Sequence, residues 1–210
     1  PRENKTRSYG TPIIRTIDGR EQMILCGSKS VASYDPATGK RHWIIDGPTE
    51  QFVASMVYNG QYLFATGGFP ERHILAIRPN GRGNVTETHI AWRERRGASY
   101  VPSPVVLGDY FLIVSDAGIA SCFDAGDGTR HWMERLGGGH SASAITANGL
   151  AYFVSDRGIT TVIRPGKEFE VVAKNDLKES TSSSPAISQG QLFIRGHQHL
   201  FCIGAPSKPH

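Results

Sequence analysis

Two histidines near the end of the sequence, His197 and His199 in the stretch GHQH, have a spacing that could bind a metal ion. In an extended segment, side chains two residues apart project from the same face, so two imidazoles could ligate one cation. A stable site needs at least one further ligand, and the neighbouring sequence offers no obvious one. Ordinary strand histidines are the interpretation that we favour, and we predict no metal-binding residue.

The cysteines and the repeated serines also argue against catalysis. Cys26, Cys122 and Cys202 lie far apart, without the Cys-x-x-Cys spacing of zinc or redox sites. Each lies in an apolar alternating segment, which predicts a small buried side chain. Ser115 and Ser155 occur in SDAG and SDRG, and neither has the Gly-x-Ser-x-Gly pattern of serine hydrolases. Because the two stretches occupy the same place in a repeat, they favour turns, and we predict no catalytic residue.

The strongest pattern is a phrase written twice, YDPATGKRHW at 34–43 and FDAGDGTRHW at 123–132. An aspartate ends an apolar strand, a glycine follows four residues later, and a tryptophan follows after four more. The positions are Asp35, Gly39 and Trp43 in the first copy, and Asp124, Gly128 and Trp132 in the second. Aspartate accepts hydrogen bonds from turn amides, glycine tolerates a positive φ, and tryptophan on the returning strand covers a neighbouring apolar face. The phrase therefore predicts a hairpin of fixed register.

The residue before each tryptophan is a histidine, His42 in one copy and His131 in the other. A catalytic histidine would be needed once, so its repetition indicates a structural position. Weaker copies occur at 74–92, which keeps Trp92 but has a longer turn, and at 160–172, which has no tryptophan. We expect the tryptophans to pack between repeats rather than to stack on a ligand.

A second phrase precedes each hairpin and contains a short strand, a glycine turn and further apolar alternation, as in SPVVLGDYFLIVSDAGIAS at 103–121. The two phrases together give about four short strands in a unit of roughly forty residues, which is typical of propeller blades. We predict an all-β protein, a β-propeller of four-stranded antiparallel blades that occupies residues 1–210 as one domain. The five expected units are 10–46, 53–96, 101–136, 141–174 and 183–204.

The fifth unit ends after three strands, so its outer strand must come from elsewhere. The stretch PRENKTRSYG at 1–10 is too polar to supply it. We therefore expect the chain to be the C-terminal portion of a larger ring of seven or eight blades. The predicted structural docking motif consists of Asp35, Gly39, Trp43, Trp92, Asp124, Gly128 and Trp132.

The spacing of aspartate, glycine and tryptophan resembles the tryptophan-docking repeat of the PQQ-like β-propeller family, which includes quinoprotein and BamB-type members. The closing stretch QLFIRGHQHLFCIG at 191–204 is similar to the final blade of that family. The resemblance covers essentially the whole chain. It implies a bacterial protein that is periplasmic, secreted or associated with the envelope.

Two functions follow from this resemblance. A PQQ-dependent dehydrogenase would stack a quinone at the ring centre beside a divalent cation and a catalytic aspartate, and the alcohol enzymes add an adjacent cysteine pair. No Cys-Cys dipeptide occurs, and no residue matches the family's cofactor ligands. We favour the alternative, a non-catalytic scaffold without a cofactor, which binds a protein partner on one face of the disc.

Charge and hydropathy exclude two further classes. The formal net charge is +4, and the basic residues are scattered except in RERR at 93–96. Nucleic-acid-binding proteins concentrate charge on one face or combine it with stacking aromatics, so we predict no nucleic-acid partner. A solvated hairpin end explains RERR better than a phosphate-binding patch does. No apolar run approaches the roughly twenty residues of a membrane-spanning helix.

Overall fold

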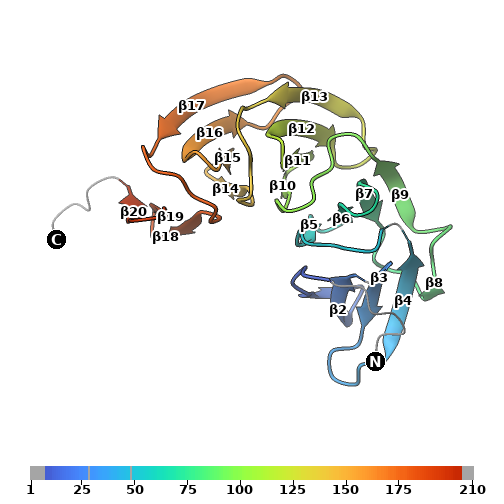
Figure 1. The fold of residues 1–210 in the computed structure, drawn as a ribbon. Helices are drawn as coiled ribbons and strands as arrows, with labels where there is room; N and C mark the ends of the chain where they lie inside the picture. Colours follow the sequence, from blue (N-terminus) through green and yellow to red (C-terminus); the bar gives the residue numbers. More distant parts are fainter. Residues whose placement is uncertain (1–7, 28, 48, 205–210) are drawn as a thin grey trace.

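The computed structural model describes residues 8–27, 29–47 and 49–204, and within these ranges the chain forms strands, turns and loops but no helix. The strands form five sheets that follow one another around an open arc, with the chain running from one end of the arc to the other (Figure 1). The expected all-β architecture of successive blades is confirmed.

The blades follow the order of the sequence. Blade 1 contains β1 (Ile13–Ile17), β2 (Arg20–Cys26), β3 (Ser30–Tyr34) and β4 (Arg41–Asp46). Blade 2 contains β5 (Val57–Tyr58), β6 (Leu63–Gly67), β7 (His73–Ile77) and β9 (Ile90–Glu94). Blade 3 contains β10 (Val105–Leu107), β11 (Tyr110–Val114), β12 (Ile119–Asp124) and β13 (Arg130–Arg135). Blade 4 contains β14 (Ile145–Ala147), β15 (Leu150–Val154), β16 (Ile159–Arg164) and β17 (Glu170–Asp176), and blade 5 contains β18 (Ala186–Ser188), β19 (Gln191–Arg195) and β20 (Leu200–Ile203).

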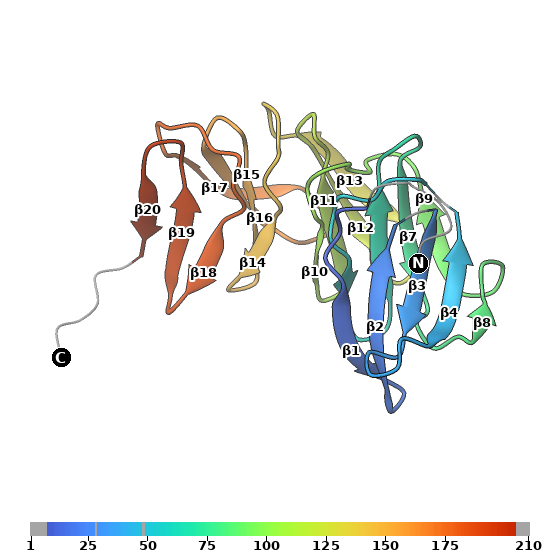
Figure 2. The same cartoon turned by 60° about the horizontal axis from the view of Figure 1, so that its bottom comes forward.

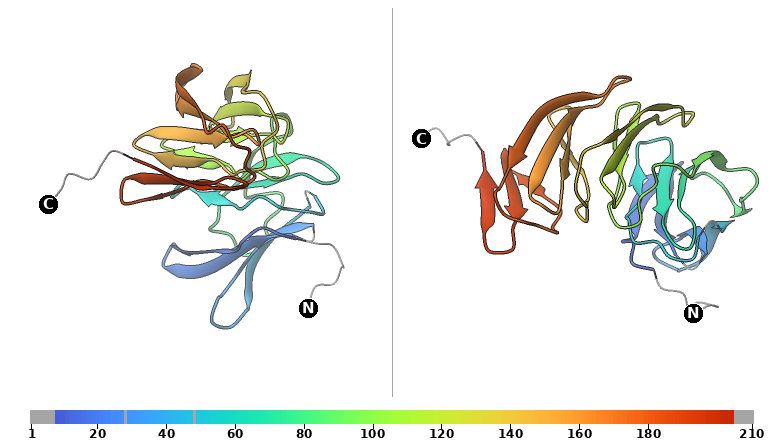
Figure 3. Two further views of the ribbon diagram at one scale, coloured as in Figure 1. Left: turned by 60° about the vertical axis from the view of Figure 1, so that its left-hand side comes forward. Right: turned by 45° about the horizontal axis from the view of Figure 1, so that its top comes forward.

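Consecutive strands within each blade pair antiparallel, with the short first strand on the inside of the arc and the last strand on the outside (Figures 1 and 3). This alternation separates the loops onto two faces, which lie at opposite edges of the view in Figure 2. We call one the turn face, because it carries the turn between the first and second strands of each blade and, in blades 1 to 4, the turn between the third and fourth strands. We call the other the connector face, because the segments 49–56, 95–104, 136–144 and 177–185 lie on it between consecutive blades.

A β-bulge recurs at the same place in blades 1 to 4, between the third strand and the outer strand. The residue just before each bulge is paired with the tryptophan position of the outer strand. The pairs are Ser33 with Trp43, Ala76 with Trp92, Cys122 with Trp132, and Val162 with Ala173. A bulge twists the strand locally and re-aims side chains, so this irregularity sets the direction of each tryptophan.

The long turn of blade 2 forms an additional strand, β8 (Gly83–Asn84), that the sequence did not predict. β8 lies on blade 1, where it pairs parallel with β4 through Trp43 with Gly83 and Ile44 with Asn84. We call residues 79–89 the strap. The strap covers the outer edge of β4, an edge that would otherwise leave backbone groups unpaired.

Apolar side chains fill the space between neighbouring blades. The three large clusters contain Trp43, Trp92 and Trp132, respectively, among buried aliphatic and aromatic residues. The cluster between blades 4 and 5 is smaller, with Ala142, Val154 and Ile194 as its buried members. Inter-blade packing therefore weakens toward the end of the arc.

Blade 5 has three strands in the described chain, as expected. Leu200 and Ile203 on β20 are 67% and 46% exposed. Cys202 on the same strand is exposed as well, so the prediction that all three cysteines are buried was wrong for this one. The reason is that no described blade packs beyond β20, whereas Cys26 and Cys122 lie within packed blades.

Candidate functional site

The turn that follows the third strand of blades 1 and 3 is organised by its aspartate. Asp35 Oδ1 accepts hydrogen bonds from the backbone N–H groups of Ala37 (2.9 Å) and Thr38 (2.8 Å). Asp124 Oδ1 accepts from Gly126 (2.8 Å) and Asp127 (3.3 Å). These bonds satisfy turn amides that would otherwise face only water.

The motif glycines adopt left-handed backbone angles, with φ of +72° at Gly39 and +78° at Gly128. The chain then reverses into the outer strand. The backbone N–H of each glycine donates to the carbonyl oxygen of its motif aspartate, at 2.8 Å for Asp35 and 3.0 Å for Asp124. The turn thus holds the following tryptophan in a fixed register.

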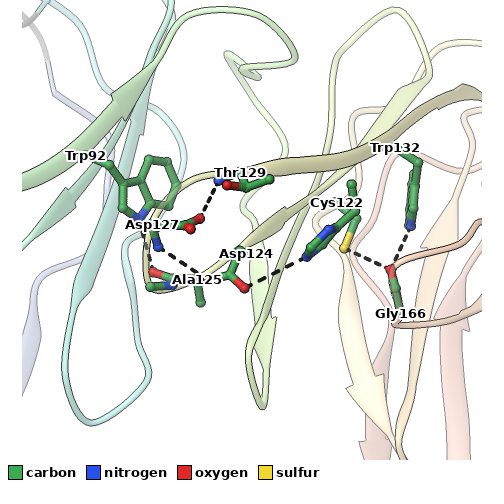
Figure 4. Close-up of polar contacts among 10 residues, drawn as sticks. Trp92, Cys122, Asp124, Ala125, Asp127, Thr129, Trp132 and Gly166 are labelled. Carbon is green, nitrogen blue, oxygen red and sulfur yellow. Dashed lines mark hydrogen bonds and ion pairs between the residues drawn. The ribbon is translucent and has the colours of Figure 1, made fainter.

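Each tryptophan connects its own blade with the next one along the chain. Figure 4 shows this contact for Trp92 and Trp132. The indole Nε1–H donates to a backbone carbonyl in the turn before the next outer strand. The acceptors are Pro79 for Trp43 (3.1 Å), Ala125 for Trp92 (3.0 Å) and Gly166 for Trp132 (3.0 Å). The three rings are 0%, 8% and 8% exposed, so these hydrogen bonds lie in a largely apolar environment.

Aromatic side chains pack against two of the three tryptophans. Trp92 stacks against Phe123 with ring centroids 6.2 Å apart and meets Phe111 edge-on at 6.1 Å. Trp132 meets Phe169 edge-on at 5.0 Å. Each ring therefore joins apolar packing with a directed hydrogen bond, which is how buried tryptophan is usually accommodated.

Blade 1 adds a polar side chain to its junction. Gln22 is fully buried, and its Oε1 accepts hydrogen bonds from Trp43 Nε1 (2.8 Å) and Ser33 Oγ (2.6 Å). Its Nε2 donates to the Pro79 carbonyl (3.0 Å), the acceptor that Trp43 also uses. This network was not predicted, because a single glutamine in an alternating strand gives no signal of its partner.

Serines connect the starts of the inner strands in a row along the connector face. The backbone N–H of Ser55 donates to Ser103 Oγ (2.9 Å), that of Ser103 to Ser143 Oγ (3.0 Å), and that of Ser143 to Ser184 Oγ (2.9 Å). One serine side chain from each of blades 3, 4 and 5 therefore accepts from the backbone of the preceding blade. The recurrence of serine at this place in four repeats was the signal that could have revealed the row.

Acidic side chains fix the connectors. Asp116 accepts from the backbone N–H groups of Tyr100 (2.8 Å) and Val101 (3.0 Å), and Asp156 accepts from Ser141 (2.8 Å). These are the aspartates of the SDAG and SDRG turns, so the turns also hold the connectors between blades. The backbone N–H of Ile119 donates to Ser115 Oγ at 3.1 Å, which is a turn contact rather than a nucleophile–base pair.

Between blades 4 and 5, Glu179 takes the same role. It accepts from the backbone N–H groups of Gln198 (2.5 Å) and His199 (3.0 Å), and from His199 Nδ1 at 2.6 Å. The side-chain hydrogen bond from His199, with those backbone bonds, lowers the pKa of Glu179 to about 2. Blade 4 has Ala173 at the tryptophan position, so polar contacts dominate this junction.

The four histidines that the sequence analysis considered do not converge on one site. His42 lies near the Glu21 carbonyl (3.3 Å), and His131 Nε2 lies 4.0 Å from Asp124 Oδ2. His199 is engaged with Glu179, and the backbone N–H of His197 donates to Ser180 (3.1 Å). Within residues 8–27, 29–47 and 49–204, no group of three or more His, Cys, Asp or Glu side chains could hold a metal ion. A search of the same ranges for an apolar helix of membrane-spanning length finds none.

The arc of radial four-stranded sheets, joined by tryptophans that dock on the next blade, defines a β-propeller of the tryptophan-docking class. A family model described as outer membrane protein assembly factor BamB matches residues 27–208. The chain therefore belongs to this PQQ-like repeat family.

Solved structures agree on the fold. The crystal structure of BamB from Moraxella catarrhalis is similar to the chain, with a TM-score of 0.66 at 14% identity. The match covers 94% of this chain and 56% of the Moraxella chain, so the sequence spans little more than half of that protein's length. A search of curated proteins finds no match. At this identity the likeness defines the fold, and function must be argued from the site.

Proposed function

We propose that the chain is a non-catalytic scaffold that binds a protein partner through the connector face. The observation that carries this proposal is that hydrogen bonds hold the loops of the connector face in fixed positions. Serine, aspartate and glutamate side chains tie the connectors to neighbouring blades at each junction from blade 2 to blade 5. Loops that are already held in place lose little conformational entropy on binding.

The family supports this proposal and suggests a cellular location. The matched family is described as an outer membrane protein assembly factor, and such a factor must contact other proteins. On the same basis we place the chain in the cell envelope of a bacterium.

Site-directed photo-crosslinking tests the proposed face. A photoreactive amino acid would replace Val101, an exposed residue of connector 95–104, and in a matched control Lys167, an exposed residue in a turn of the opposite face. We expect a discrete crosslinked product from position 101 and none from position 167. Equal crosslinking from both positions, or from neither, contradicts the proposal.

A second measurement separates this proposal from the quinoprotein alternative. The purified chain would be mixed with PQQ and calcium, and the absorbance of the quinone followed on addition of primary alcohols. A scaffold is expected to leave the spectrum unchanged. Tight binding of PQQ with alcohol-dependent reduction would contradict the non-catalytic assignment and support a PQQ-dependent dehydrogenase.

A further inference from the structure

A pocket of about 320 Å³ opens between blades 2 and 3 and is lined by residues from both blades. Arg95 and Arg96 come from the start of connector 95–104, and Arg72 comes from the turn between β6 and β7. All three belong to the connector face. We call this the arginine pocket, lined by Arg72, Arg95, Arg96, Ala98, Ile119 and Met133, together with Gly97 and Ser115.

The pocket carries an excess of positive charge. Of its three arginines, only Arg95 lies within 4.0 Å of a carboxylate in the described chain, with its Nη2 at 3.4 Å from Glu71 Oε2. Glu94 is a further acidic neighbour. Its Oε1 accepts the backbone N–H groups of Arg95 (2.6 Å) and Arg96 (2.9 Å), and its charge interacts with that of Arg96. The carboxylate thus shapes the turn that presents the guanidinium groups. RERR was predicted to be a solvated hairpin end, whereas it ends β9 and begins a connector.

The rest of the lining is mostly apolar. Ala98 is 1% exposed, and Ile119 and Met133 from blade 3 complete this surface. Gly97 has a φ of +83°, and a Cβ there would lie 2.6 Å from Ser121 Oγ and 3.2 Å from Met133 Cε. Any residue other than glycine at position 97 would place its Cβ in the space beside Ser121 and Met133.

Beside the pocket, the hydroxyl group of Ser121 gives an observation that is independent of the arginines. Its side chain is fully buried, and its Oγ has no hydrogen-bond partner among the residues that the structure describes. A buried hydroxyl without a partner costs free energy. Its position beside Gly97 places a spare donor next to the lining of the pocket.

We infer that the arginine pocket binds an acidic peptide segment of a protein partner, with an aliphatic side chain on the apolar lining and flanking carboxylates on the arginines. This inference rests on the proposed scaffold function and specifies its contact. Guanidinium groups bind carboxylates through paired, planar hydrogen bonds. The apolar lining fits a peptide side chain better than an inorganic anion. The lining residues include no aromatic ring, so the pocket lacks the aromatic stacking platform that is typical of sites for single-stranded nucleic acid.

Fluorescence polarisation tests the inference with a labelled peptide of sequence Glu-Asp-Leu-Glu-Asp. Two matched peptides carry serine in place of leucine, or glutamine and asparagine in place of the acids. We expect the first peptide to bind and both others to bind at least about tenfold more weakly. Binding should also weaken between about 50 and about 300 mM salt, because the arginines are exposed.

Variants assign the binding to the pocket. The double substitution Arg72→Ala/Arg96→Ala is expected to weaken peptide binding at least about tenfold. The control Arg82→Ala/Arg157→Ala removes two exposed arginines outside the pocket and should change it less than about twofold. Because all four side chains are exposed, both variants should fold, and thermal melting checks this.

Several results would overturn the inference. These are absence of peptide binding, equal binding of the serine peptide, unchanged binding by the Arg72→Ala/Arg96→Ala variant, or displacement by inorganic phosphate at concentrations that salt alone cannot explain. Crosslinking from position 101 reports separately on the proposed function. A discrete crosslink that persists in the double variant would leave the scaffold standing and remove this pocket from it.

Discussion

The indole of Trp92 lies directly against Gly128 in the next blade, so a Cβ at residue 128 would come within 2.7 Å of indole Cδ2. Gly128 also has a left-handed φ of +78°. Gly39 occupies the same motif position in blade 1 with a φ of +72°, but nothing lies within 4 Å of its Cβ position. In blade 1 the motif position favours glycine only because of its backbone angle. In blade 3 it favours glycine because of the backbone angle and because the Trp92 ring leaves no room for a Cβ.

This difference predicts unequal costs for the same substitution. Gly39→Ala adds only the strain of a left-handed alanine, about 1–2 kcal/mol. Gly128→Ala adds a collision with a buried ring and should cost about 1–3 kcal/mol more. Urea unfolding followed by tryptophan fluorescence gives both free energies. Equal losses in the free energy of unfolding would show that the Trp92 ring moves away from an added Cβ at no cost, and that its packing does not depend on Gly128.

Trp132 separates ring packing from the hydrogen bond to Gly166. Trp132→Ala removes a large buried side chain and should destabilise the chain by about 3–5 kcal/mol. Trp132→Phe keeps an aromatic ring against Phe169 but removes the indole donor, and should cost about 1–2 kcal/mol. The same unfolding experiment measures both. If the phenylalanine variant is as unstable as the alanine variant, the directed hydrogen bond dominates the docking.

Local spacing was enough to predict the hairpins, because the aspartate, glycine and tryptophan of each motif act within ten residues of one another. The acceptors of the indole groups could not be predicted. Pro79, Ala125 and Gly166 contribute backbone carbonyls, which every residue has, so no side-chain signal marks them. Long-range contacts of this kind are decided by how the blades pack.

The strap and the arginine pocket escaped prediction for a related reason. Gly83 and Asn84 form a strand only because β4 offers a free edge about forty residues earlier in the chain. Arg72 and Arg96 are separated along the sequence and meet only when a turn and a connector reach the same face. Most basic residues are scattered along the sequence, and folding brings Arg72 close to Arg95 and Arg96.

Glu179 makes the junction of blades 4 and 5 sensitive to acid. Its pKa is lowered from the usual 4.5 to about 2, first by the hydrogen bond from His199 and then by the backbone N–H of Gln198. Because the folded-state pKa lies below the unfolded one, the ionised carboxylate stabilises this contact above pH 4.5. The contribution is lost as the pH falls from there through about 2.

Amide hydrogen exchange can follow this loss at the site itself. The protection of the Gln198 and His199 amides should decrease as the pH falls from 4.5 to about 2, relative to amides in the core of blade 3. In Glu179→Gln, the protection of these amides should be lower and should no longer change over that interval. An identical pH response in the variant would assign the effect to another group.

The three cysteines should differ sharply in reactivity. Burial raises the pKa of Cys26 and of Cys122 to about 12, so both thiols stay protonated and inaccessible near neutral pH. Cys202 is exposed on β20. A thiol reagent at about pH 8 should label one thiol per folded chain and all three in urea. Cys202→Ser should abolish the fast reaction, and labelling of that variant in the folded state would contradict the burial of the other two.

The strap should protect blade 1 from association. Val85 is 4% exposed within the first inter-blade cluster, and its backbone N–H donates to the Ile44 carbonyl at 2.9 Å. The Asp46 N–H donates to Thr86 Oγ1 at 2.9 Å. Replacement of residues 80–88 by a short turn would expose the backbone groups of β4 and a patch of the apolar cluster.

We expect the shortened variant to remain all-β in circular dichroism but to elute as dimers or larger species in size-exclusion chromatography, because a free outer edge can pair with a second chain. The loss of buried Val85 should also lower the free energy of unfolding by about 1–3 kcal/mol. Thr86→Ala should show a smaller effect in the same direction, since it removes the hydrogen bonds of Thr86 Oγ1 with Asp46 and with Asn84 but keeps the rest of the strap. Thr88→Ala, which changes a strap hydroxyl bonded to His89, serves as the matched control. If the shortened variant elutes like the parent chain and unfolds at the same urea concentration, the strap has no protective role, and its pairing with β4 is dispensable.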